Sequence, residues 1–342
     1  MRDQRFGREA FRDLLPADTS ASLLFRDPPD HTRLRNLLSK VFTGSLGADL
    51  RSKIEQIADG LLAAREELHE MDLISDFAAP LPVYVISDIL GAPAEEREQL
   101  VLRCREIALG TDGEADSSAR ARAAAAHDEI SKYFRSLMAE RSKRPQADLM
   151  TRLIHAVDEA GHRLTESETL AVCEMLFFTG HQTTIDLIGN GVLTLLRHPG
   201  QLQILRENPT LLSSAIEELL RYESPVQRTG RVTNSAVEMG GKTIPKGRVV
   251  LAILGAANRD PSKFEQPDRL HIGRLGNRHL AFGLGPRFCL GAMLARLEGA
   301  VAIRALLQRF SSLALTTGSP VWRNSTETRG LLRLPVSLSR ST

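Results

Sequence analysis

Apolar residues recur every three or four positions along most of the chain, in segments rich in Ala, Leu, Arg and Glu. This spacing places apolar side chains on one face of an α-helix. A polar, Gly-containing segment, 110–120, predicts a loop between two helices. The pattern predicts helices over these ranges: 31–42, 48–68, 80–90, 93–109, 118–143, 147–159, 166–197, 201–207, 210–222 and 290–310.

Strand-like patterns are confined to two regions. In 231–254, short β-like runs flank a Gly-Gly turn and a Pro-Lys-Gly turn, and in 312–338 apolar and polar residues alternate. The sequence shows neither an internal repeat nor a low-complexity linker. We therefore expect residues 1–342 to form a single, mainly α domain with a small β-sheet region.

The longest predicted helix, 166–197, has a polar centre. Residues 179–184 read TGHQTT, and Gly costs a helix interior roughly 1 kcal/mol. The hydroxyls of Thr183 and Thr184 can donate hydrogen bonds to the carbonyls of Thr179 and Gly180, which would bend the helix or open a groove in it. Buried helices in general tolerate Thr in this way, so the pattern alone does not specify a function.

Composition narrows the class of protein. The net charge is +2 and the basic residues are scattered, so the sequence does not indicate a nucleic-acid partner. The three cysteines form no CxxC pair, which argues against a disulfide scaffold or a zinc site. The N-terminus lacks an apolar signal core, and charged or polar residues interrupt the apolar run 170–196. We expect a cytoplasmic protein without a membrane span.

Cys289 lies in a Gly-rich segment, 281–298, directly before an Ala- and Leu-rich helix. Glycines allow a backbone to approach a flat ligand closely, and a helix N-terminus stabilises a thiolate. Such a thiolate can bind iron. Most free cysteines are small buried hydrophobic residues, as we expect for Cys104 and Cys173. The Gly-x-Gly pair here lacks the third glycine of a dinucleotide loop.

Two pairs of charged residues share helix faces. Glu218 and Arg221 are three residues apart, and such a pair at a surface contributes at most about 0.5 kcal/mol. His31 and Arg35 are four residues apart and could hold an acidic group. A solvated surface helix would show either pattern.

In order and spacing, these motifs resemble the cytochrome P-450 family of haem-thiolate monooxygenases, soluble bacterial type. FGLGPRFCLG (282–291) resembles the cysteine-ligand loop, EELLR (217–221) the ExxR pair and PDRL (267–270) the meander. HTRLR (31–35) resembles the helix that binds a propionate, FTGHQTT (178–184) the oxygen-binding groove, and NRDP (258–261) also fits. The resemblance extends from about residue 3 to the end of the chain.

The resemblance implies a large helical domain with a small sheet region, in which the first strands and the first helix are missing. Only 30 residues precede His31. The missing strands would leave an open sheet edge, a wide pocket mouth and a tendency to self-associate.

The resemblance also implies roles for individual residues. Cys289 would bind the iron of haem b. The other cofactor-binding residues would be His31, Arg35, Arg231, Phe282, Gly283, Arg287 and Gly291. Thr183, Gln182 and Gly180 would serve oxygen and proton handling. Residues facing the substrate would be Met175, Phe178, Thr179 and Val226. Glu218, Arg221 and Arg269 would form a structural ion group.

Two positions depart from the family pattern. Gln182 stands where the family usually has an acid, and Thr179 where it has alanine. Both departures put the usual proton-delivery route in doubt, because an amide does not titrate near neutral pH.

The implied activity is insertion of one oxygen atom from O2 into a lipophilic small molecule, usually as a hydroxylation. The sequence shows no flavin or iron–sulfur module, so electrons would come from NAD(P)H through a ferredoxin and its reductase. Two alternatives remain open. One is a truncated or inactive haem-binding protein without turnover, which the short N-terminus and Gln182 favour. The other is a peroxide-driven haem-thiolate enzyme that needs no proton relay.

Overall fold

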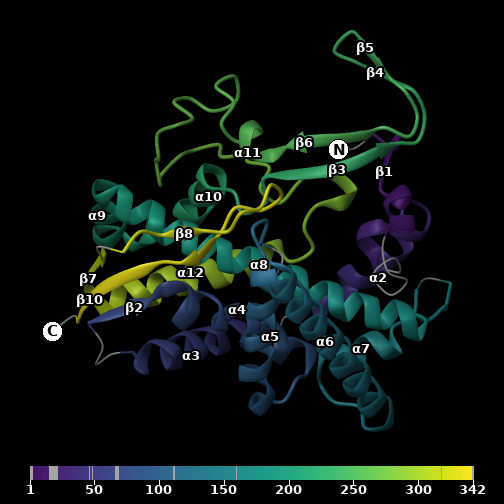
Figure 1. Cartoon of the computed structure of the whole chain (residues 1–342), viewed down its shortest axis with the longest axis horizontal. Coiled ribbons are helices and arrows are strands. Elements are labelled where there is room, and N and C mark those ends of the chain that lie inside the picture. Colours follow the sequence, from purple (N-terminus) through teal and green to yellow (C-terminus); the bar gives the residue numbers. More distant parts are fainter. Residues whose placement is uncertain are drawn as a thin grey trace.

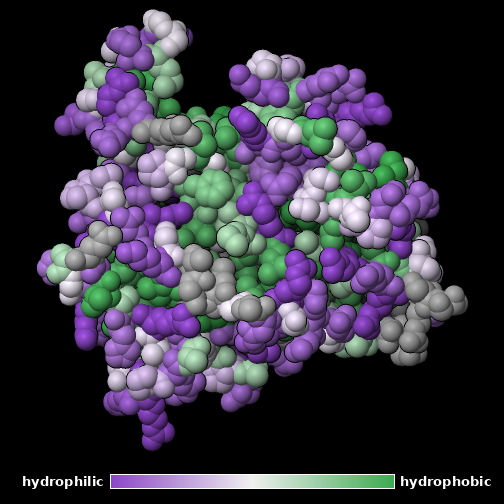
Figure 2. All heavy atoms as spheres, turned by 180° about the vertical axis from the view of Figure 1, so that it is seen from behind, coloured by the Kyte–Doolittle hydropathy of each residue, from purple (hydrophilic) through white to green (hydrophobic). Residues whose placement is uncertain are grey.

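The computed structural model describes residues 3–14, 22–45, 47, 49–65, 69–110, 112–158, 160–316 and 318–340. Figure 1 shows α4 and α8 at the centre of the molecule, α5, α6 and α7 below and to the right of them, and strands along the upper and left sides. Figure 2 shows the opposite face, where apolar side chains lie in the middle and hydrophilic ones surround them.

Every helix range expected from the sequence contains a helix. The helices are α2 (Asp30–Ser45), α3 (Leu50–Ala63), α4 (Pro80–Leu90), α5 (Arg97–Gly110), α6 (Ser117–Lys143), α7 (Leu149–His155), α8 (Glu166–Arg197), α9 (Pro199–Glu207), α10 (Leu212–Tyr222), α11 (Leu254–Ala257) and α12 (Ala292–Arg309). Shorter helical turns are η1 (Glu9–Leu14), η2 (Leu23–Phe25), η3 (Ile74–Ala78), η4 (Ala94–Glu96), η5 (Pro209–Leu211) and η6 (Gly285–Arg287). Within the described ranges, no helix is both long and apolar enough to cross a bilayer.

The strands form small antiparallel sheets. One sheet has the order β1 (Phe6–Gly7), β3 (Arg228–Thr233), β6 (Val249–Ile253). A second has the order β2 (Glu70–Asp72), β10 (Pro335–Arg340), β7 (Phe310–Leu315). Two hairpin pairs are β4 (Val237–Met239) with β5 (Lys242–Ile244), and β8 (Val321–Trp322) with β9 (Leu331–Arg333). Both predicted strand regions are confirmed, whereas β2 and η3 were not predicted, because segments this short show no periodicity.

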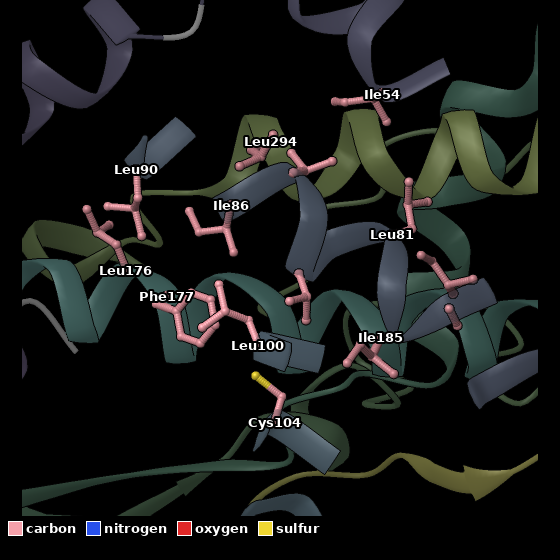
Figure 3. Close-up of a cluster of buried hydrophobic side chains, with 14 of the residues drawn as sticks. Ile54, Leu81, Ile86, Leu90, Leu100, Cys104, Leu176, Phe177, Ile185 and Leu294 are labelled. Carbon is pink, nitrogen blue, oxygen red and sulfur yellow. The ribbon is translucent and has the colours of Figure 1, made fainter. Parts of the chain in front are cut away.

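Helix α8 runs through the hydrophobic core. Thr165 caps its N-terminus and forms a capping box with Glu168. Its glycines allow close packing, since a Cβ at Gly189 would lie 2.6 Å from the Cδ1 atom of Ile74. Figure 3 shows side chains of α8 beside those of α3, α4, α5 and α12, among them Ile54, Leu81, Ile86, Leu90, Leu100, Cys104, Leu176, Phe177, Ile185 and Leu294. This packing makes α8 a fixed wall for anything bound beside it.

A buried ion group joins α10 to the segment that precedes Cys289. The Nε and Nη2 atoms of Arg221 donate to the two carboxylate oxygens of Glu218, each at 2.8 Å, and both side chains are fully buried. Glu218 also accepts the backbone N–H of His271 at 2.9 Å and the side-chain N–H of Asn277 at 3.1 Å. The Glu218–Arg221 pair is therefore a core element and not a surface pair.

The third charged member of this group is Arg274, which corrects the expectation of Arg269. The Nε atom of Arg274 donates to the two Glu218 oxygens at 3.0 and 3.1 Å. The side chain of Arg269 points outward to Gln266, and only its backbone carbonyl joins the group, as an acceptor for Arg221 and Arg274. The turn at Arg269 directs its side chain to solvent and brings Arg274, five residues later, back to Glu218.

We expect Glu218→Ala to lower the free energy of unfolding by about 3–5 kcal/mol, because Arg221 would remain buried without its charged partner. Urea denaturation followed by circular dichroism measures this change. Glu207→Ala removes an exposed acid on α9 and should change the value by about 0.5 kcal/mol or less. Equal stability of the two variants would contradict a structural role for Glu218.

Candidate active site

A cavity of about 330 Å³ lies where α8, α2, β3 and the start of α12 meet. Apolar side chains from α4, α8, α10 and α12 form much of its wall. Most of the predicted site residues line it, although they come from segments far apart in the sequence: His31, Arg35, Met175, Thr179, Gly180, Thr183, Val226, Arg231, Phe282, Gly283, Arg287, Cys289 and Gly291.

A glycine-dependent loop presents Cys289 to this cavity. Gly283 and Gly285 have φ angles of 72° and 81°, which favour glycine over other residues. The backbone N–H of Cys289 donates to the carbonyl of Phe282 at 3.0 Å, and α12 begins three residues later. The loop therefore fixes the thiol between the cavity and a helix N-terminus.

The environment of Cys289 differs from that of the other two cysteines. Cys104 and Cys173 are buried in the core, and burial alone strongly raises the pKa of Cys104. Burial also raises the pKa of the Cys289 thiol, but the Gly291 N–H and the guanidinium groups of Arg35 and Arg296 act in the opposite direction. Of the three, Cys289 is the one with groups around it that stabilise a thiolate.

Arg296 also holds the loop in place. Its guanidinium lies over the ring of Phe282, 4.4 Å from the centroid. The same group forms an ion pair with Glu217, whose carboxylate also contacts His279 at 3.1 Å. These contacts tie the loop to α10 and leave little freedom for Cys289 to move.

Positive charge gathers along one side of the cavity. Arg8, Arg35, Arg231 and Arg287 line it, and no Asp or Glu does so among the described residues. Burial and the neighbouring Arg8 and Arg287 lower the pKa of Arg231 to about 10. Burial, with Arg287 and Arg35, lowers the pKa of His31 to about 4. These cations repel one another, so the cavity favours an anionic group.

Asp27 balances part of this charge from behind. It pairs with Arg287 at 2.6 Å and accepts the backbone N–H of Arg8 at 2.9 Å. The side chain of Arg8 donates to the carbonyl of Gly230 and to the hydroxyl of Thr229, both at 3.2 Å. Sequence reasoning missed Arg8, because nothing in its local pattern places it beside β3.

The polar centre of α8 forms the opposite wall. Three hydroxyls donate to carbonyls one turn earlier, as predicted for the last two: Thr179 to Met175 at 2.6 Å, Thr183 to Thr179 at 3.2 Å and Thr184 to Gly180 at 3.3 Å. Gly180 packs on Ile86 of α4, whose Cγ1 atom would lie 3.3 Å from an added Cβ. The side chains of Thr183 and Thr184 are therefore held beside the cavity by the helix itself.

Phe178 does not line the cavity, which corrects the expectation that it faces the substrate, and Gln182 does not line it either. Phe178 stacks on His127 of α6, with ring centroids 4.9 Å apart. Gln182 donates to Asp186 at 3.1 Å, and Asp186 pairs with Arg323 at 2.7 Å. Burial raises the pKa of Asp186 to about 6, although Arg323 and Gln182 favour its charged form. Phe178 and Gln182 are one helical turn apart and therefore lie on the same face of α8, which is not the face that carries Thr183.

Comparison with known proteins assigns the family. Residues 94–339 match the family model described as Cytochrome P-450. The chain is 45% identical to cytochrome P-450 107B1 of Saccharopolyspora erythraea over 322 residues, which cover 93% of this chain and 78% of that protein. It is 42% identical to vitamin D(3) 25-hydroxylase of Pseudonocardia autotrophica, over 95% of this chain and 79% of that protein.

The fold agrees with this assignment. The solved structure of P-450 BioI in complex with an acyl carrier protein ligated to hexadec-9Z-enoic acid superposes with a TM-score of 0.88 at 40% identity. The match covers 99% of this chain and 89% of that one. From its sequence, its fold and the loop that carries Cys289, the chain belongs to the cytochrome P-450 family of monooxygenases.

Proposed function

We propose that this protein uses haem b to insert one oxygen atom from O2 into a lipophilic small molecule, most simply as a hydroxylation. One observation carries the proposal: a thiol at a helix N-terminus faces a largely apolar cavity, which four arginines line and to which the described residues contribute no carboxylate. A soft anionic ligand and several cations in one apolar site match an iron macrocycle that bears two carboxylates.

The residues of the cavity fit this cofactor. Cys289 would bind the iron, while His31, Arg35, Arg231 and Arg287 would hold the propionates, helped by Arg8. Gly291 has open space around its α-carbon, so the backbone there can lie against a flat ligand. Phe282 and Gly283 would lie against the same face. When bound, the iron with its thiolate ligand supplies the chemistry that cleaves the O–O bond.

The wall formed by α8 would act on oxygen and protons. Thr183 would present its hydroxyl to the cavity where O2 would react, and Gly180 would leave space beside it. The proposed role of Gln182 is indirect, because its amide is bound to Asp186. Met175, Thr179 and Val226 would contact the substrate, since they line the same cavity.

The lipophilic substrate class rests on the lining and on the relatives. Leu176, Leu254 and Leu294 add to the apolar surface. One relative is named for hydroxylating vitamin D(3), and one solved neighbour holds a carrier protein ligated to an unsaturated fatty acid. We propose that a ferredoxin and its reductase deliver electrons from NAD(P)H, and that the protein works in the cytoplasm.

A peroxide-driven reaction is a second candidate. It is favoured by the position of Gln182, which stands where the family usually has an acid and points away from the cavity. Product formation with hydrogen peroxide alone, compared with NAD(P)H and the two electron-transfer proteins, separates the two functions. A protein that binds haem and forms product with neither oxidant would be the non-catalytic alternative.

We expect Cys289→Ser to abolish the strongly red-shifted Soret band that thiolate ligation gives to the reduced, CO-bound protein. Cys104→Ser and Cys173→Ser are matched controls in the core and should keep the band. If Cys289→Ser keeps it and either control loses it, the assignment of the iron ligand is wrong.

We expect Arg231→Ala to weaken haem binding by about 1.5–3 kcal/mol, the value of one charge-assisted hydrogen bond. Transfer of haem to an excess of apomyoglobin measures the loss. Arg228→Ala on the same strand, β3, is the control, because Arg228 bonds to Thr326 outside the cavity. Equal haem retention by the two variants would contradict a propionate-binding role for Arg231.

We expect Thr183→Ala to lower the fraction of NAD(P)H electrons that end in product, with a matching rise in released peroxide. Thr183→Ser keeps the hydroxyl and should retain most of the coupling. Both fractions come from one assay of NAD(P)H, product and peroxide. Unchanged coupling in Thr183→Ala would show that this hydroxyl takes no part in oxygen or proton handling.

A further inference from the structure

A second pocket, of about 420 Å³, lies between the start of β3 and the loop 323–329, which joins β8 to β9. Three arginines, three hydroxyl side chains, one amide, Trp322 and Ile253 line it, and none of these residues lines the cavity that contains Cys289. Its volume falls within the range of about 300–1,000 Å³ that small-molecule sites have. The proposed function makes no use of this pocket.

One short segment of backbone separates the two sites. Val226 and Thr229 line the cavity, whereas Gln227 and Arg228 line the second pocket. Val226 also forms an isolated antiparallel bridge with Thr328, which lines the second pocket from the opposite side. The two sites are therefore neighbours that share a wall and differ in their linings.

The loop 323–329 is fixed without any ligand. Arg323 pairs with Asp186 of α8 at 2.7 Å, and both side chains are buried. The backbone carbonyl of Arg329 accepts the side-chain N–H of Asn190, also on α8, at 2.8 Å. A site whose residues are already held in place loses less entropy when a ligand binds.

The three arginines of the pocket differ in their partners. Arg323 pairs with the buried acid of α8, and Arg329 pairs with Glu223 at 2.6 Å. Arg228 pairs with no acid among the described residues. It donates to the hydroxyl of Thr326 at 2.6 Å, and its buried Nε atom has no hydrogen-bond partner. No Asp or Glu in the described part of the chain lines the pocket, so one guanidinium is left to bind a negative charge.

Apolar surface lies in the same pocket as this cation. Trp322 and Ile253 both line the pocket, and the guanidinium of Arg329 lies over the Trp322 ring, 3.9 Å from its centroid. A ligand with one anionic group and an apolar body would use both kinds of surface. A phosphate group carries roughly −1.5 to −2 charge near neutral pH, which a single unpaired arginine balances only in part. The lining therefore favours a carboxylate over a phosphate.

We propose that this pocket is a second binding site, separate from the haem cavity, for a lipophilic monocarboxylate. The carboxylate would accept the free Nε–H of Arg228 and hydrogen bonds from the neighbouring hydroxyls. The apolar body would lie against Trp322 and Ile253. The inference goes beyond the proposed function, because binding in this pocket requires neither iron nor O2.

The test uses the intrinsic fluorescence of Trp322, the single tryptophan of the chain. Phenylacetate and octanoate are titrated into the haem-loaded protein, with imidazole kept on the iron so that the cavity is occupied. Both carboxylates should change the fluorescence in a saturable way. Phenylacetamide has the same shape without the charge and should bind at least about 10-fold more weakly. Inorganic phosphate lacks the apolar body and should cause no change.

Arg228→Gln should weaken the binding of both carboxylates on the order of 10- to 100-fold, the loss expected for a charge-assisted hydrogen bond. Arg333→Gln is the matched control, because Arg333 is an exposed arginine of β9 that lies outside the pocket. If Arg228→Gln fails to fold, Ile253→Asp should show the same loss, since it places a carboxylate in the pocket. Ile253 is half exposed on the edge strand β6, where such a change is tolerated. The Soret shift caused by imidazole should be the same in every variant.

The inference would be overturned if neither carboxylate changes the fluorescence, if phenylacetamide or phosphate binds as tightly as phenylacetate, or if Arg228→Gln binds like the wild type. A wild-type protein that binds phenylacetate in this pocket but forms no product with either oxidant would overturn the proposed function and leave the second site standing.

Discussion

The ion group of Glu218, Arg221 and Arg274, in which Glu218 and Arg221 are fully buried, constrains the rest of the site. Arg221 donates to the backbone carbonyls of Asn258 and Pro267 at 2.9 and 2.8 Å, besides its bonds to Glu218. Buried charges are stable only when every one of them finds a partner in good geometry. These hydrogen bonds fix the conformation of the chain from Asn258 onward, and this segment leads to the loop that presents Cys289.

Two opposite electrostatic demands meet in the cavity that this path creates. The thiol needs N–H groups and cations to become an anion, and Gly291, Arg35 and Arg296 supply them on one side. The positive charge of the arginines near Arg231 is stabilised by anions, and Asp27 neutralises only part of it. A ligand that the thiolate coordinates and that carries its own carboxylates would stabilise both the thiolate and the arginines. This explains why Cys289 and the arginines line the same cavity.

Features that depend on neighbouring residues were predictable from the sequence, whereas contacts between residues far apart in the sequence were not. The bounds of α8 and the hydrogen bonds of Thr183 and Thr184 depend on residues within one turn, so both predictions were confirmed. Arg274 replaces Arg269 because the partner depends on the direction of a turn some fifty residues after Glu218. A helical wheel would have separated Phe178 and Gln182 from the cavity face, since each stands one residue before a cavity-lining threonine and is rotated about 100° from it.

The contacts of Gln182 give the two faces of α8 different surroundings. Gln182, Asp186 and Arg323 form a buried polar group that joins α8 to the segment after β8, so the outer face of α8 serves structure. The inner face keeps the hydroxyls of Thr179, Thr183 and Thr184 on the cavity. Because α12 begins three residues after Cys289 and packs on α8, the cysteine loop and the hydroxyls of α8 are held on two helices in contact. The position of the cysteine loop relative to α8 is then set by the packing of these helices.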